Sequence, residues 1–313
     1  MSFLGAEIDG PMVIARAVHF AASATVAGAL MFRTVVADPA LRGEDKAGAV
    51  IDRQIRTLAW IALVIAAISG GAWLLLQTAS MSGQTSGEVM MSGALLAVLD
   101  ETQFGLVSEV RLALALLLAI CLAYDRRSLA RWLASAAALC FAVSIAWTGH
   151  AASTPYKLGY LHLTADALHL CGAAAWTGGL MALVLLLNAV GQNGAAEIEL
   201  DAVRRFSALG MFSVATLIVT GIVNAWILVG SFRALVQTDY GWVLMEKLAV
   251  FAVMIAFATV NRFWLTPELA SPASDRAVRR LTRNAIAEIA LALIVFAIVG
   301  VLGTLHPAAH LVK

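Results

Sequence analysis

Eight long apolar stretches constrain this chain more than any other feature of its sequence. Each is long enough for an α-helix to cross the hydrocarbon core of a bilayer, which takes about 20 residues. The runs are continuous rather than alternating, which favours helices over the strands of a membrane barrel. We therefore predict an all-α, polytopic membrane protein whose eight spanning helices cover approximately residues 11–36, 55–78, 104–124, 130–149, 159–188, 205–231, 240–265 and 282–305.

The overall composition supports this prediction. Apolar residues make up 61% of the chain and charged residues 13%, against about 45–50% and 25% in a typical soluble domain. The formal net charge of +1 argues against a nucleic-acid partner. The expected surroundings are membrane lipid.

Basic residues are concentrated in the connections on one side of the predicted membrane. Fifteen lie there: Arg33, Arg42, Lys46, Arg53, Arg56, Arg126, Arg127, Arg131, Arg204, Arg205, Arg262, Arg276, Arg279, Arg280 and Arg283. The other side has only Lys157, Arg233 and Lys313. Because basic connections stay in the cytoplasm, we expect both termini to face outward, which is the periplasm in a Gram-negative cell. Residues 1–10 contain no Lys or Arg, so we expect the first helix to be retained rather than cleaved as a signal.

The second half of the chain repeats several features of the first half. The matched pairs are His19 with His169, Gly28 with Gly178, Met31 with Met181, Ser69 with Thr220, Thr102 with Thr238, Gly105 with Gly241, and Arg111 with Lys247. Four helices per unit preserve the direction of the chain. This predicts two parallel four-helix repeats, residues 1–153 and 154–313, related by an axis along the membrane normal.

Ionisable side chains are costly inside a membrane and therefore indicate functional sites. All six histidines fall in the predicted outer half: His19, His150, His162, His169, His306 and His310. On the fifth span, His162, Asp166 and His169 are spaced so that they share one helical face. Imidazole and carboxylate together suit copper(II), zinc, iron or nickel. We predict an inner metal site of His19, His169 and Asp166, with the other four histidines forming its access from outside.

Softer donors extend this prediction toward copper(I). Met245, Cys140, Cys171 and Met181 are candidates for a relay, and Met81, Met90 and Met91 lie in the predicted outer loop 79–101. Structural alternatives remain open. A membrane histidine is often only a contact between helices, and Asp166 can pair with Arg16, which occupies the equivalent position in the repeat. Glu109 with Arg111, and Glu246 with Lys247, are predicted to form a polar core, whereas Glu288 receives no role.

Helices five to seven resemble a known family. The similarity rests on His162, His169, Trp176, Gly178-Gly179-Leu180, Arg205-Phe206-Ser207, Thr220-Gly221, Asn224-Ala225, Thr238, Tyr240-Gly241 and Lys247. This pattern resembles the CopD (copper resistance protein D) family of inner-membrane copper-handling proteins. The resemblance covers about residues 145–305 well and implies eight membrane helices, copper handling and a separate periplasmic CopC-type copper-binding partner.

Three functions follow as hypotheses. The first is copper uptake from the periplasmic side, which favours a transporter over an enzyme. The second is a redox protein, a metal-dependent oxidoreductase that exchanges electrons with quinone through copper or through a haem b held by His19 and His169. The third is a membrane docking partner for a periplasmic copper chaperone.

Overall fold

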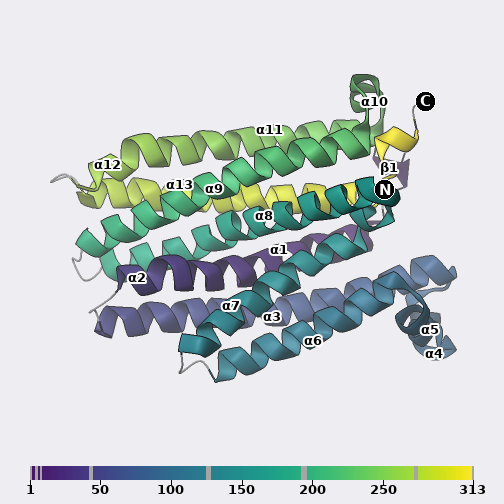
Figure 1. Cartoon of the computed structure of the whole chain (residues 1–313), viewed down its shortest axis with the longest axis horizontal. Coiled ribbons are helices and arrows are strands. Elements are labelled where there is room, and N and C mark those ends of the chain that lie inside the picture. The colour runs from purple at the N-terminus through teal and green to yellow at the C-terminus, as the bar shows by residue number, and fades with distance from the viewer. Residues whose placement is uncertain are drawn as a thin grey trace.

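The computed structural model describes residues 2–3, 6–7, 9–41, 45–124, 128–191, 196–270 and 274–311. Within these ranges the protein is a bundle of long helices (Figure 1), and eight of them are long and apolar enough to cross a membrane. This confirms the predicted all-α membrane fold. The described strands are two short segments, β1 (Ser2–Phe3) and β2 (Ala6–Glu7), which pair antiparallel ahead of the first helix.

The first four spans fill the N-terminal half. They are α1 (Gly10–Phe32), α3 (Asp45–Ser82), α6 (Gln103–Ala123) and α7 (Ser128–Val143). A π-helix, η1 (Arg33–Ala37), and α2 (Asp38–Ala40) extend α1, and the 3₁₀-helix η2 (Ser144–Thr148) extends α7. Another 3₁₀-helix, η3 (His150–Ser153), leads into the C-terminal half.

The other four spans are α8 (Tyr156–Gly191), α9 (Ala196–Val229), α11 (Asp239–Val260) and α13 (Ser274–Leu302). The π-helix η4 (Asn261–Leu265) and α12 (Thr266–Glu268) extend α11, and the 3₁₀-helix η5 (Ala308–His310) follows α13. The short helix α10 (Phe232–Gln237) precedes α11.

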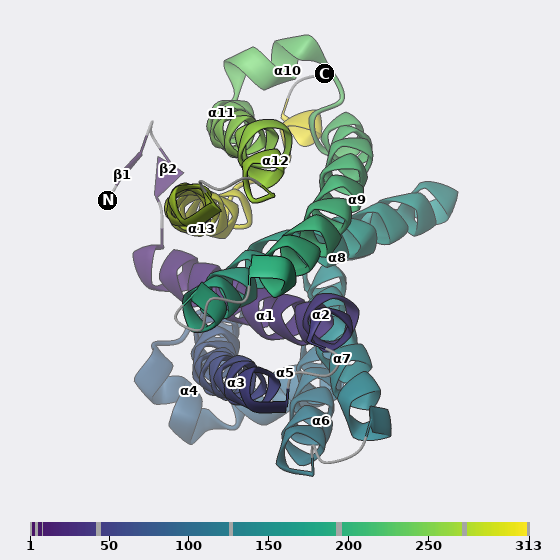
Figure 2. The same cartoon turned by 90° about the vertical axis from the view of Figure 1, so that its left-hand side faces the viewer.

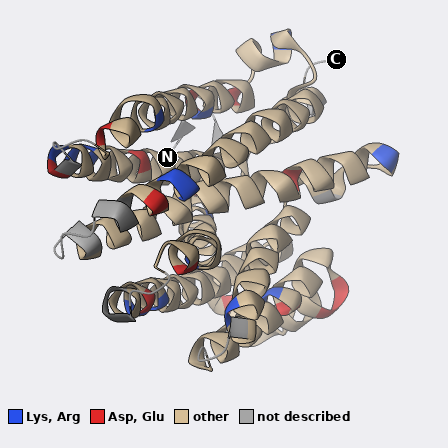
Figure 3. Ribbon diagram, turned by 60° about the vertical axis from the view of Figure 1, so that its left-hand side comes forward, with Lys and Arg blue, Asp and Glu red and all other residues tan. Residues whose placement is uncertain are grey.

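Both termini lie at the same end of the bundle, as eight crossings require (Figure 1). We call this the termini end and the other the opposite end. Charged residues gather toward the helix ends, and the middle lengths of most spans carry few of them (Figure 3). This distribution is expected for helices whose middles lie in hydrocarbon. That the termini end faces the periplasm stays a prediction.

The helices α1 and α8 form the centre of the bundle. In their most apolar windows 83% and 67% of residues are buried, against 39% or less in the other spans. Figure 2 shows α3 and α6 on one side of this pair and α11 and α13 on the other. The two helices touch where Gly28 meets Gly178: a Cβ on Gly28 would lie 1.9 Å from the Ala174 oxygen, and one on Gly178 would lie 2.5 Å from the Ala24 oxygen. Only glycine permits this approach.

Two matching corners at the termini end explain the repeated Thr-x-x-Gly motif. Thr102 Oγ1 accepts a hydrogen bond from the Gly105 N–H at 2.9 Å and caps α6, and Thr238 Oγ1 accepts one from the Gly241 N–H at 3.1 Å and caps α11. Each glycine lies against a carbonyl of the preceding short helix, so a Cβ would lie 2.1 Å or 2.0 Å from that oxygen. The motif therefore builds a sharp turn from a short helix into a spanning helix.

The segment expected to be the outer loop 79–101 is largely helical. After the end of α3 it forms α4 (Ser86–Ser92) and α5 (Ala94–Glu101). A reciprocal capping box between Thr85 and Glu88 starts α4, and Gly93, with φ of 73°, separates the two helices. Hydrogen bonds from the Thr85 N–H and hydroxyl hold the pKa of the Glu88 carboxyl below its usual value. The structure exposes Met90 and Met91 by 69% and 91%.

Candidate functional site

Two polar clusters are each built around a histidine of a central helix, His19 of α1 and His169 of α8. In the N-terminal half, His19 of α1 is 2% exposed, and its Nδ1 lies 2.9 Å from the Ala66 carbonyl oxygen of α3. A carbonyl only accepts, so Nδ1 carries the proton and Nε2 carries the lone pair. Arg111 of α6 donates to this Nε2 from Nη2 at 2.5 Å. Both ring nitrogens of His19 are therefore hydrogen-bonded to the protein.

Arg111 is fixed from several directions. Its Nη1 donates to the Phe141 carbonyl and to Ser144 Oγ, both at 2.6 Å, and its guanidinium lies 4.3 Å from the centre of the Phe141 ring. The guanidinium is a permanent positive charge beside the His19 lone pair, and like charge opposes a metal ion there. The prediction that His19 binds metal stays a prediction, but in this arrangement Arg111 would first have to move away.

Arg16, one helical turn before His19, is also buried. Its guanidinium lies 5.0 Å from the Trp73 ring centre and 5.6 Å from that of Phe20, and a Cβ on Gly303 would collide with it. Among the described residues its Nε has no hydrogen-bond partner. The structure therefore places Arg16 on aromatic rings and does not pair it with Asp166.

The second cluster, in the C-terminal half, differs from the first in the hydrogen bonds of its histidine. His169 Nδ1 of α8 lies 2.9 Å from Thr220 Oγ1 of α9, and the Thr220 hydroxyl donates its single proton to the Thr216 carbonyl at 2.6 Å. Thr220 must therefore accept, so Nδ1 of His169 carries the proton and Nε2 carries the lone pair. Lys247 of α11 takes the place of Arg111 and interacts electrostatically with His169. Among the described hydrogen bonds, none uses the His169 Nε2 lone pair.

Asp166 completes this second cluster. It lies three residues before His169 on the same face of α8, and its Oδ1 accepts from Asn224 Nδ2 at 3.3 Å. It also interacts electrostatically with Lys247 and with Tyr240. The cluster therefore joins a carboxylate, an imidazole lone pair and an ammonium from α8 and α11, and Asn224 and Thr220 of α9 position the first two.

Glu109 and Glu246 do not belong to either cluster. Both are exposed, whereas Arg111 and Lys247 face the bundle interior. A helix turns by about 100° per residue, so neighbours one or two positions apart point to different sides. Arg16, which we also counted in the predicted polar core, and Arg111 are buried, and Lys247 is half-buried.

The structure brings two of the predicted access histidines together. The Thr154 hydroxyl donates to the His150 carbonyl at 3.2 Å and lies 2.7 Å from His162 Nδ1, which ties η3 to α8. The rings of His150 and His162 interact electrostatically. His306 is exposed beyond the end of α13, and the side chain of His310 lies outside the described residues. In the described ranges no three His, Cys, Asp or Glu side chains form a ready metal site.

The predicted soft donors are scattered. Cys140 of α7 is exposed, and Cys171 of α8 is half-buried. Met181 Sδ accepts from the Thr25 hydroxyl at 3.5 Å, and Met245 is half-buried. The three described cysteines are free thiols, with Cys121 buried in the bundle. The role of these groups as a copper relay stays a prediction.

The prediction of functional residues missed a polar cluster around Glu288. The Glu288 side chain of α13 is 1% exposed and accepts hydrogen bonds from Trp176 Nε1 at 3.2 Å and Asn261 Nδ2 at 2.7 Å. Asn284 Nδ2 in turn donates to Asn261 Oδ1 at 2.9 Å. An acidic residue in an apolar span was the available signal, but its two partners come from two other helices, α8 and η4, and share no sequence motif.

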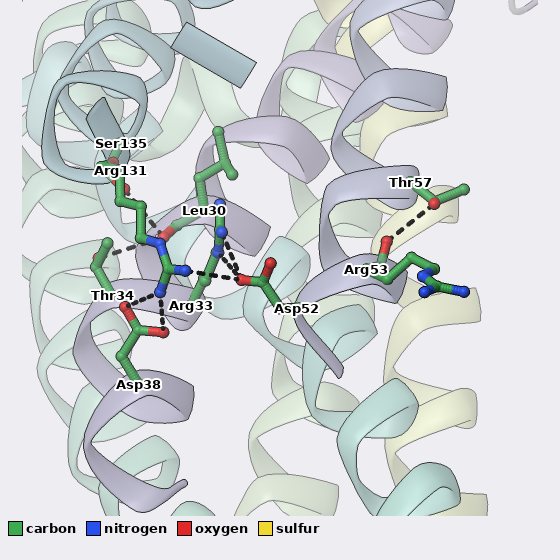
Figure 4. Close-up of polar contacts among 9 residues, drawn as sticks. All are labelled: Leu30, Arg33, Thr34, Asp38, Asp52, Arg53, Thr57, Arg131 and Ser135. Carbon is green, nitrogen blue, oxygen red and sulfur yellow. Dashed lines mark hydrogen bonds and ion pairs between the residues drawn. The ribbon is translucent and has the colours of Figure 1, made fainter. Parts of the chain in front are cut away.

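Charge pairs close the N-terminal half at the opposite end (Figure 4). Buried Arg33 of η1 pairs with Asp52 of α3. Arg131 of α7 lies 3.3 Å from Asp38 and 3.8 Å from Asp52. Ser135 Oγ adds a hydrogen bond to the Leu30 carbonyl at 3.1 Å. These contacts join α1, with its extensions η1 and α2, to α3 and α7 and hold the helices together at this end of the bundle.

Most of the chain is similar to proteins of one known family. Residues 7–160 match the family model for the copper resistance protein D-like N-terminal domain, and residues 200–302 match that for copper resistance protein D. Copper resistance protein D of Pseudomonas syringae pv. tomato is 30% identical over 279 residues, which cover 85% of this chain and 88% of that protein. Inner membrane protein YebZ of Escherichia coli K12 is 28% identical over 292 residues, or 93% and 97% of the two chains.

With a third relative, the similarity covers a smaller share of both proteins. Copper transport protein CutJ of Bacillus subtilis 168 is 30% identical over 200 residues, which span 61% of this chain and 36% of that protein. No solved structure matches the chain.

Proposed function

Since the chain belongs to the copper resistance protein D family of multi-pass inner-membrane proteins, we propose that it binds copper at the Asp166–His169 cluster and takes it up from the periplasm. Relatives are named for copper resistance and copper transport, which supports copper as the cargo. The excess of basic residues in the connections at the opposite end supports a periplasmic termini end.

The single observation that carries this proposal is the contrast between the two matching histidines. His19 gives its Nε2 lone pair to Arg111, whereas the described contact of His169 uses only Nδ1. Thr220 accepts from the Nδ1–H of His169 and so fixes the tautomer whose Nε2 has a free lone pair. Metal-binding histidines commonly donate their other ring N–H to such an acceptor. Asp166 on the same face supplies an anionic oxygen that compensates the charge of an incoming ion.

Copper bound there would compete with Lys247 for Asp166. The electrostatic interaction between Lys247 and Asp166 balances the charge of the cluster, which lowers the cost of a carboxylate in the membrane. A cation that replaces the ammonium beside Asp166 keeps the local charge balanced. In this proposal His150 and His162 receive copper first, because they lie together nearer the termini end. Copper then binds at Asp166 and His169 and displaces Lys247.

The difference between the hydrogen bonds of His19 and His169 favours copper over haem as the ligand. A haem held by both histidines needs the Nε2 atoms of His19 and His169 to ligate one iron, and the Arg111 contact occupies the first of these atoms. A periplasmic CopC-type protein is the proposed copper donor. The exposed Met90 and Met91 of α4 offer thioether groups at the end of the bundle where such a donor would arrive.

The test compares His169→Ala with His19→Ala in purified full-length protein loaded with copper and analysed for bound metal. We expect His169→Ala to lose its tightly bound copper and His19→Ala to keep it, with Asp166→Asn weakening binding about tenfold or more. Circular dichroism on each variant checks that the helices are retained. Equal copper content in the His169→Ala and wild-type proteins would refute the site.

A further inference from the structure

A cavity of about 480 Å³ lies between α8, α9, α11 and α13, toward the opposite end from the histidines. Its walls are mostly apolar and include Leu180, Phe206, Val214 and Ile255. The helix α9 packs along α8 and meets α10, α12 and η5 near its ends, but it does not pack extensively against α11 or α13 (Figure 2). A volume of this size is within the range of about 300–1,000 Å³ that is usual for pockets that hold organic ligands.

The acidic group in the lining of the cavity is the Glu288 carboxyl. Oε1 accepts from Asn261 Nδ2, and Oε2 accepts from Trp176 Nε1. These partners are neutral donors, and among the described residues no Lys, Arg or His side chain forms an ion pair with Glu288. Each carboxyl oxygen has two lone pairs and uses one of them here. Glu288 therefore retains capacity to accept hydrogen bonds from a ligand in the cavity.

The helix beside Glu288 has an irregular turn at this point. Asn261 is the first residue of the π-helix η4, and Thr266 Oγ1 donates to its carbonyl at 2.7 Å. Single π-turns within α-helices occur frequently at functional sites. Arg262, the next residue, lines the cavity and is held by a hydrogen bond from its Nη1 to Ser207 Oγ at 2.6 Å. The remaining N–H groups of this guanidinium are additional donors for a ligand oxygen.

We propose that this cavity binds a quinol, a lipid-soluble ring with hydroxyl groups, one of which donates a hydrogen bond to Glu288. The free lone pairs of the Glu288 carboxyl accept from a ligand hydroxyl, whereas the ester groups next to the acyl chains of a phospholipid have no hydrogen to donate. The apolar and aromatic walls suit a ring and an isoprenoid tail. Because α9 and α11 are not closely packed together, the tail can leave between them into the bilayer. The site is separate from the proposed copper cluster and does not depend on it.

The probe is decylubiquinol kept reduced under anaerobic conditions, compared with its dimethyl ether, which has the same ring and tail but no hydroxyl donor. Binding to the purified full chain in phosphatidylcholine nanodiscs is measured by calorimetric titration. We expect the wild-type protein to bind the quinol about three- to tenfold more tightly than the ether, because the hydrogen bond to Glu288 is lost. Glu288→Leu, which leaves no acceptor, should remove that difference, and Glu109→Leu, the same change at an exposed position, should preserve it.

A second variant tests the cavity without touching the carboxyl. A Cβ on Gly210, which lines the cavity, would meet no atom within 4 Å, and the same is true of Gly71 on α3, which does not line it. Gly210→Leu should abolish quinol binding by filling the space, whereas Gly71→Leu should leave it unchanged. Copper content should be unaffected in all four variants.

Two outcomes overturn the proposal. Equal affinity of the wild-type protein for quinol and dimethyl ether would show that the cavity accepts any apolar chain, such as a lipid acyl group. Unchanged quinol affinity in Gly210→Leu would show that the ligand binds elsewhere. Since copper is measured separately, failure of the quinol proposal leaves the copper site standing, and the reverse also holds.

Discussion

Replacing Gly28 by alanine tests whether the contact between α1 and α8 holds the two halves together. A Cβ on Gly28 would lie 1.9 Å from the Ala174 oxygen and 2.7 Å from the Gly178 Cα. Ordinary van der Waals contact begins near 3.4 Å, so the central helices must separate by about 1 Å or more. Over-packing of this kind costs about 1–3 kcal/mol, and both atoms belong to backbone that has no rotamer to change.

The control is Gly71→Ala, because a Cβ there meets no atom within 4 Å. Alanine is preferred over glycine in a helix by up to about 1 kcal/mol, so we expect Gly71→Ala to be neutral or mildly stabilising. Gly28→Ala should lower the free energy of unfolding by about 1–3 kcal/mol. The measurement is reversible unfolding in mixed micelles by titration with sodium dodecyl sulfate, followed by circular dichroism.

The double variant sharpens the test. Gly28 and Gly178 face each other at one contact, so a separation caused by the first alanine also makes room for the second. Neighbouring substitutions are not additive, and we expect Gly28→Ala with Gly178→Ala to cost less than the sum of the two single changes. If Gly28→Ala unfolds at the same detergent fraction as Gly71→Ala, then this crossing is not close-packed and the reasoning fails.

Two further predictions concern the copper cluster and the opposite end. Thr220→Val removes the acceptor that orients His169, so copper affinity should fall about tenfold or more; unchanged affinity in a copper competition titration would argue against this role for Thr220. Asp52→Asn removes an anionic partner of buried Arg33 (Figure 4), and the free energy of unfolding should fall by about 2 kcal/mol, less than for a fully buried pair because Asp52 is 27% exposed. The same change at Asp201, in an exposed pair, should cost well under 1 kcal/mol, and equal costs at both sites would contradict the assignment.

Part of the candidate site could be predicted from residue type and spacing. His162, Asp166 and His169 share a face of one helix, and the structure puts Asp166 and His169 into one cluster and His162 beside His150. The matched positions in the two halves also predicted comparable surroundings for His19 and His169. Both rings contact the Ser-Gly or Thr-Gly step of the next long helix in their own half. These features follow from helical geometry, which is the same wherever the helix lies.

The chemistry of the two histidines could not be predicted in the same way. The outcome depends on whether a guanidinium or an ammonium reaches the ring from a third helix, and on which acceptor holds Nδ1. Similarly, Glu109 and Glu246 looked like partners of their basic neighbours but face outward. Glu288 had no apparent partner until packing brought Trp176 and Asn261 to it.

The sequence by itself determined that the chain crosses a membrane eight times, because a bilayer requires long, uninterrupted apolar helices and the composition leaves no alternative. It also determined the Thr-x-x-Gly corners and the small residues at the central crossing, which act over one or two helical turns. Only the tertiary structure decided which lone pair remains available for a ligand and where a buried carboxyl meets a cavity. Those properties depend on the relative rotation and separation of helices far apart in the chain. A small rotation of one helix, or a shift of a few ångströms, changes which side chain a buried polar group contacts.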